Sequence, residues 1–157
     1  MKNARIKNLG FTLIELLVVV AIIGLLSSII TVALNNSRMK ARDARRITDI
    51  KQVKSGLDIY YANGSGYPDK AVWDANVGKQ LLCGSTNVMQ EPQDPLGTNP
   101  YSYSSLGNST TGCGGTVWNN YEIEFYIEKQ AKYYIMNADG NLREKATGNP
   151  VSFDQLL

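Results

Sequence analysis

A single carboxylate stands inside the most apolar stretch of the sequence. Glu15 lies near the start of the run Phe11–Leu34, which holds no other charged residue. A charge in bilayer hydrocarbon costs about 2.5–3.5 kcal/mol on insertion scales, so such a residue is seldom accidental. Thr12 and Glu15 also match the S/T-x-x-E capping box, in which the two side chains satisfy free amide groups where a helix begins. These residues therefore predict a helix cap. Because a cap alone does not explain a charge placed in an apolar run, Glu15 is expected to have a further role.

The other side chains offer little catalytic chemistry. Histidine is absent, which excludes Ser-His-Asp and Cys-His catalysis and every metal site that needs histidine. Asp94 and Asp139 could be considered as calcium ligands, because carboxylate and carbonyl oxygens suit that ion. The turn-rich segments around them favour plain turn chemistry instead. We expect no enzyme activity, no cofactor and no metal site.

The two cysteines, Cys83 and Cys113, lack the close spacing of a CxxC redox or zinc motif. In an exported chain such a pair is predicted to form one disulfide, whereas in the cytosol it would remain two thiols. Both lie in glycine-bearing, turn-rich surroundings. The alternative is a pair of buried thiols that only pack.

The amino-terminal region has the pattern of a membrane segment. A short basic stretch containing Lys2, Arg5 and Lys7 precedes an apolar run of about 20 residues, long enough to span a bilayer as a helix. The net charge of the whole sequence is +2. Without these three basic residues, 13 basic residues remain against 14 acidic ones, and the net charge becomes −1. Neither value indicates a nucleic-acid partner. The length of 157 residues suits one domain with its own core.

The helical period continues past the apolar run. One apolar stripe with steps of three and four is formed by Ile47, Ile50, Val53, Leu57 and Tyr60/Tyr61. The charged residues assigned to the other positions are Arg46, Asp49, Lys51 and Asp58. We predict one helix from about Thr12 to about Ala62, roughly 75 Å long.

The rest of the chain predicts a small antiparallel sheet. Residues 121–127 alternate apolar and polar side chains, as a half-buried strand does, and residues 131–136 suggest its hairpin partner across Lys129-Gln130. Asp139-Gly140 marks a further turn toward Leu142. A short helix is expected over residues 71–82, and a turn-rich connector over residues 91–100. The fold class is α+β, with a long N-terminal helix, membrane-spanning in its first half, packed on the sheet.

The stretch KNLGFTLIELLVVVAIIG resembles the amino terminus of type IV pilins and of the pseudopilins of type II secretion systems. The resemblance implies that Gly10 ends a leader and that prepilin peptidase cleaves the Gly10–Phe11 bond. It also implies that Phe11 becomes the N-methylated terminus and that Glu15 is the family's assembly glutamate. Cleavage creates an ammonium on Phe11, which the Glu15 of a neighbouring subunit would neutralise. Such a pair penalises misregistered assembly, because a mismatch leaves one charge alone.

The expected organisation follows from these elements. We expect a leader at residues 1–10, a transmembrane and assembly helix at 11–34, its amphipathic continuation at 35–62, and a pilin-like globular domain at 63–157. Basic residues flank both ends of the apolar run, so the positive-inside count is ambiguous. The cysteine pair and the polar C-terminal part favour an outside C-terminus.

The resemblance implies a structural subunit of a type IV pilus or type II secretion pseudopilus. It would be held by one span in the inner membrane and then built into a homo-polymer or a mixed filament, periplasmic or extracellular. Its expected partners are prepilin peptidase, the inner-membrane assembly machinery and other pilins or pseudopilins. The alternative is a membrane-anchored extracytoplasmic binding domain that does not polymerise.

Overall fold

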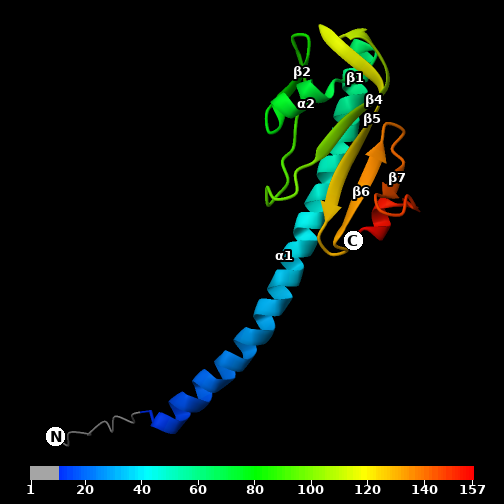
Figure 1. The fold of residues 1–157 in the computed structure, drawn as a ribbon. Coiled ribbons are helices and arrows are strands. Elements are labelled where there is room, and N and C mark those ends of the chain that lie inside the picture. The colour runs from blue at the N-terminus through cyan, green and yellow to red at the C-terminus, as the bar shows by residue number, and fades with distance from the viewer. Residues whose placement is uncertain (1–10) are drawn as a thin grey trace, which may run out of the picture. The chain divides into compact units, whose positions relative to one another are not determined.

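A computed structural model describes residues 11–157 (Figure 1). The chain divides into two compact units, one ending at Arg38 and the other comprising Met39–Leu157, and each is described by itself. The predicted leader at residues 1–10, with Gly10 of the predicted cleavage site, lies outside the described residues.

The described part of the first unit is a helix with an apolar surface. α1 (Leu13–Gly64) begins here and continues into the second unit. Every residue from Phe11 to Arg38 is exposed, and most of the large side chains among them are Leu, Ile or Val. By length and composition, α1 contains a segment able to cross a membrane. The observed helix bounds confirm the predicted helix to within two residues at each end.

The second unit joins the remaining turns of α1 to an antiparallel sheet, which confirms the α+β class. The sheet has six strands in the order β1-β5-β6-β7-β8, with β4 also pairing with β5. Figure 1 shows β4 and β5 lying along this part of α1. The strands are β1 (Tyr67–Pro68), β4 (Ser102–Gly112), β5 (Gly115–Ile127), β6 (Lys132–Asn137), β7 (Leu142–Glu144) and β8 (Pro150–Val151), followed by the 3-10 helix η1 (Phe153–Gln155).

The core lies between α1 and the sheet. Five members of the predicted stripe are buried, namely Ile47, Ile50, Val53, Leu57 and Tyr60, whereas Tyr61 is exposed. Their partners include the inward side chains of β5, which alternate as predicted. β5 pairs with β6 so that Phe125 lies opposite Tyr134, and the turn at residues 139–140 leads into β7. The predicted strand, hairpin and turn are thus confirmed.

The region between helix and sheet differs in part from the prediction. The helix expected over residues 71–82 ends early: α2 covers Lys70–Asn76, and β2 (Gln80–Cys83) follows, paired with β3 (Thr86–Gln90). The helix stops before Gly78, whose φ of +74° suits glycine and ends helical geometry. The connector at residues 91–100 has no regular secondary structure, as predicted.

The predicted disulfide is present between Cys83 and Cys113, with the Cα atoms 4.6 Å apart. It joins the end of β2 to the turn between β4 and β5. The last turn of α1 approaches the same place closely, because a Cβ on Gly112 would collide with the carbonyl oxygen of Gly64. The bond therefore ties the small β2–β3 hairpin to the main sheet beside the end of the helix.

Candidate functional site

The start of α1 carries the predicted capping box. The backbone N–H and the hydroxyl of Thr12 donate to Glu15 Oε2 at 2.8 and 2.7 Å, and the backbone N–H of Glu15 donates to Thr12 Oγ1 at 3.2 Å. This arrangement satisfies amide donors that a helix start leaves free. Phe11, just before it, is 86 % exposed.

The cap uses only part of the hydrogen-bonding capacity of Glu15. Both Thr12 donors reach Oε2, and within residues 11–157 no hydrogen bond is made to Oε1. A carboxylate can accept about four hydrogen bonds through its two oxygens. Glu15 can therefore cap its own helix and still receive a positive group from another molecule.

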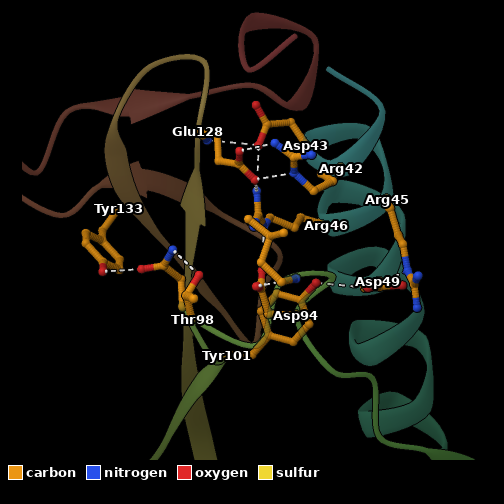
Figure 2. Close-up of polar contacts among 12 residues, drawn as sticks. Arg42, Asp43, Arg45, Arg46, Asp49, Asp94, Thr98, Tyr101, Glu128 and Tyr133 are labelled. Carbon is orange, nitrogen blue, oxygen red and sulfur yellow. Dashed lines mark hydrogen bonds and ion pairs between the residues drawn. The ribbon is translucent and has the colours of Figure 1, made fainter. Parts of the chain in front are cut away.

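A second cluster of charges lies inside the Met39–Leu157 unit (Figure 2). The guanidinium of Arg46 is fully buried and contacts three carboxylates from three parts of the chain. Its Nε donates to Asp94 at 2.5 Å, and its NH1 donates to Asp43 at 2.9 Å and to Glu128 at 2.5 Å. Arg46 thereby joins α1, the connector and the turn after β5.

Neighbouring groups complete this cluster. Arg42 makes a bidentate pair with Glu128, from Nε to Oε1 at 2.9 Å and from NH2 to Oε2 at 2.7 Å. Asp43 accepts hydrogen bonds from the backbone N–H groups of Glu128 and Lys129, at 2.8 and 2.9 Å. One turn of the helix thus holds both the side chain and the backbone of the β5–β6 turn.

A further polar contact extends the cluster along α1. The hydroxyl of Tyr101 donates to Asp49 at 2.9 Å, while Arg45 Nε lies 3.9 Å from the same carboxylate (Figure 2). Burial raises the pKa of Asp49, although the Tyr101 hydrogen bond and the charge of Arg45 oppose this shift. The helix therefore holds the connector through Asp94, and it also holds Tyr101, the residue that directly follows the connector.

Electrostatics in the cluster favour the ionised forms of its central pair. The hydrogen bond from Arg42, together with that from Arg46, lowers the pKa of Glu128 to about 2 against the opposing effect of burial. Burial would lower the pKa of Arg46, but the hydrogen bonds to Asp94 and Glu128 outweigh it and raise that pKa. Both groups stay charged across the ordinary pH range, so the cluster acts as a fixed ionic clamp.

The sequence prediction placed Arg46 and Asp49 on the solvent side of the helix, which is wrong. Arg46 is fully buried and Asp49 is 8 % exposed, whereas Lys51 and Asp58 are exposed as predicted. A signal was present, because Arg46 lies four residues before Ile50 and seven before Val53, on the apolar stripe itself. A charged residue at a stripe position has to be paired when it is buried.

The structure gives other roles to the residues considered as calcium ligands. Asp94 pairs with Arg46 and also accepts the backbone N–H of Leu96. Asp139 lies at a turn, where Asn137 donates to it at 3.4 Å. Among residues 11–157, no group of three or more His, Cys, Asp or Glu residues is arranged to hold a metal ion.

Comparison with known proteins identifies relatives along most of the chain. Residues 5–31 match the family model described as the prokaryotic N-terminal methylation motif. The type II secretion system core protein G of Vibrio cholerae is 36 % identical over 119 residues, covering 71 % of this chain and 80 % of that protein. The proteins of the same name from Aeromonas hydrophila and Pectobacterium carotovorum are 33 % and 30 % identical, covering 62 % and 68 % of this chain and 73 % and 76 % of their own lengths. No solved structure matches the chain.

Proposed function

Because the chain belongs to the family of the type II secretion system core protein G, we propose that it is a structural subunit of a secretion pseudopilus, assembled through its amino-terminal helix. The observation that carries the proposal is the surface of residues 11–34, which is apolar, exposed and interrupted by one carboxylate. A surface of this kind is stable only in lipid or against other apolar helices.

Cleavage of the leader would create a positive charge, the ammonium on Phe11, that can neutralise Glu15. We propose that prepilin peptidase removes residues 1–10 by cleaving after Gly10 and that the new terminus at Phe11 is methylated. The match of residues 5–31 to the methylation motif supports this proposal. The ammonium on Phe11 then lies four residues before Glu15 in the same chain, but the hydrogen bonds from Thr12 already occupy one oxygen of that carboxylate.

Assembly pairs the two charges between copies. The free Oε1 of Glu15 receives the Phe11 ammonium of a neighbouring subunit, so that both charges are neutralised within the apolar bundle. Truncating one partner of a buried, hydrogen-bonded charge pair costs 2–5 kcal/mol or more in comparable interfaces, largely because the other charge remains alone. The pair therefore fixes the register between helices that are otherwise uniformly apolar.

The subunit passes through two environments in this proposal. Residues 11–34 lie in the inner membrane before assembly and in the filament afterwards, with the C-terminal residues outside the cytoplasm. Residues 35–62 continue the helix, and residues 63–157 form the globular domain on which it packs. The Cys83–Cys113 disulfide suits an oxidising compartment and supports this placement. The alternative, an anchored binding domain that does not polymerise, is not favoured, since the relatives are secretion system core proteins.

The proposal is tested by separating the charge of Glu15 from its role as a cap. Glu15→Ala removes both, whereas Thr12→Val removes the hydroxyl of the cap and keeps the carboxylate. We expect Glu15→Ala to reduce strongly the fraction of subunits recovered in sheared filaments and Thr12→Val to leave most of it. The Met39–Leu157 unit should melt at the same temperature in both variants. If Glu15→Ala enters filaments as well as the unchanged chain does, the carboxylate is only a cap.

A further inference from the structure

We propose that the cavity at Glu91 receives the ammonium group of Lys40 from a neighbouring copy of this chain. The inference rests on the proposed assembly into a filament and adds a second specific contact, made by the globular unit rather than by the apolar helix. Both residues lie in the Met39–Leu157 unit.

Glu91 is a buried carboxyl group without a partner. The residue is 1 % exposed, and neither of its carboxyl oxygens has a hydrogen-bond partner within the described residues. Its backbone is held in place, because its N–H donates to the carbonyl of Lys79 at 2.8 Å. Native structures rarely leave a buried polar group unsatisfied, so an orphaned carboxyl group calls for an explanation.

Glu91 lines a polar cavity of about 350 Å³ between α1 and the connector. The other lining residues are Arg45, Gln52, Gly78, Gln90, Pro92 and Gln93. Three of them are glutamines, whose amide oxygens can accept hydrogen bonds. Gly78 lets the Gln93 side chain lie directly against the backbone, where a Cβ would collide with it. Both carboxyl oxygens of Glu91 are buried in the free subunit, so an incoming group reaches them when the glutamine side chains of the cavity turn aside. A carboxyl group beside these amides then suits a compact group with several donors, such as an ammonium.

The charged groups around the cavity leave this carboxyl unpaired. Arg45 lines the cavity, but its guanidinium is directed to Asp49, and its side chain is 64 % exposed. Asp74 of α2 adds a like charge nearby, and burial is the larger effect; together they raise the pKa of Glu91 to about 8. Lys79 contributes only its backbone carbonyl. The isolated subunit thus holds Glu91 mainly as the neutral acid at pH 7, which avoids a buried charge.

Lys40 is the lysine best placed to supply the missing charge. It is exposed, and within residues 11–157 it takes part in no ion pair or hydrogen bond. Every other lysine in this range has an ion pair, a hydrogen bond or an aromatic contact of its own. Lys40 therefore loses no existing contact when it binds a neighbour.

The spacing along α1 indicates how two copies would be offset. The cavity is lined by Arg45 and Gln52 and so lies beside the helix near residue 48, eight residues beyond Lys40. At 1.5 Å per residue this separation is about 12 Å along the helix axis. Parallel copies shifted by this distance bring Lys40 of one to the level of the Glu91 cavity of the next.

The contact makes assembly sensitive to pH. Docking of an ammonium stabilises the ionised carboxylate, so each contact releases the proton that Glu91 carries in the free subunit. Below pH 8 assembly should therefore weaken as the pH falls, and Glu91→Gln should remove this dependence. Arg45, Asp49 and Asp74 remain in the variant, so their own effects on the pH profile are unchanged.

A double-mutant cycle on the full chain tests the contact. Glu91→Gln and Lys40→Gln should each lower the fraction assembled about tenfold or more, since each leaves one partner alone in the interface. The double variant should be no worse than either single variant, because the two effects are one interaction. Lys132→Gln, which changes an exposed lysine of β6 that does not line the cavity, should assemble normally. Glu91→Gln should not lower the melting temperature, which excludes misfolding as the cause.

The results separate this contact from the proposed function. Normal assembly of Glu91→Gln, or losses from the two substitutions that multiply, would overturn the contact while leaving filament formation intact. Glu15→Ala in the same assay reports on the proposed function. If Glu15→Ala assembles normally, that function fails, whatever the cycle at Glu91 gives.

Discussion

Arg46→Met is the substitution that probes the ionic clamp most directly. Methionine fills most of the space of the arginine stem but removes the guanidinium that contacts Asp43, Asp94 and Glu128. Glu128 keeps Arg42, whereas Asp43 and Asp94 both lose their cation. Asp43 keeps two backbone N–H donors, but Asp94 keeps only the one from Leu96, so Asp94 is left with the weaker support. Removing one partner of a buried ion pair costs about 3–5 kcal/mol. For a unit of this size, that loss lowers the melting temperature by roughly 10–20 °C.

The assay is thermal unfolding of the full chain in detergent, followed by near-ultraviolet circular dichroism. This signal reports on the packed aromatic core, in which Trp73 stacks on Tyr103 with ring centroids 4.8 Å apart. Arg45→Met is the matched control, because its side chain is 64 % exposed and its Nε is 3.9 Å from Asp49. Exposed pairs contribute about 0–1 kcal/mol, so this control should melt close to the unchanged chain.

A second substitution identifies the cause of the loss. Adding Asp94→Asn to Arg46→Met neutralises the orphaned carboxylate and should recover part of the lost stability, because a neutral amide is cheaper to bury than a charge. The reasoning would be refuted if Arg46→Met melted with the Arg45→Met control. It would also be refuted if Asp94→Asn brought no recovery.

Three further results are expected. The pKa of Glu128 is lowered from 4.5 to about 2, so its contribution to stability is complete above pH 4.5 and is lost as the pH falls toward 2. Glu128→Gln should remove this part of an acid-unfolding curve, about 3 kcal/mol in all, and an unchanged curve would contradict the pairing. Reducing the Cys83–Cys113 bond, which closes a 30-residue separation, should cost roughly 3–4 kcal/mol in urea unfolding, and equal midpoints with and without reductant would exclude a stabilising bond. Gly112→Ala, which meets the Gly64 backbone, should lower the melting temperature more than Gly56→Ala, which meets the flexible Met89 side chain; the reverse order would contradict the observed close approach.

The elements that depend on local pattern were predictable from the sequence. The helix follows from a long apolar run joined to a stripe of period 3.6, and it ends at Gly64, where the NGSGYP segment breaks the pattern. β5 follows from strict alternation. β4 was not predicted, because its Ser, Thr, Asn and Gly residues carry no apolar alternation. Its strand form depends on pairing with β5 and on the burial of Tyr103, which are tertiary effects.

Of the two candidate sites, the one at Glu15 could be recognised in the sequence and the one at Arg46 could not. Glu15 was recognisable because a charge in an apolar run is conspicuous, and its cap follows from a local spacing of three residues. The ionic clamp around Arg46 was not recognisable, because its partners Asp94 and Glu128 lie 48 and 82 residues away in the sequence. Long-range pairing of this kind leaves no periodic signal, although the stripe position of Arg46 indicated that its charge would need partners.

The mature amino terminus is the measurement that tests the central claim most directly. The intact mass and the N-terminal peptide should be determined for the chain purified from cells that carry a prepilin peptidase. Assembly through the processed helix predicts a chain that begins at Phe11 with a methylated amino group, and a longer precursor when Gly10 is replaced by a bulky residue. A mature chain that begins near Leu34, where an ordinary signal peptidase would have removed the apolar run and Glu15 with it, would contradict the account.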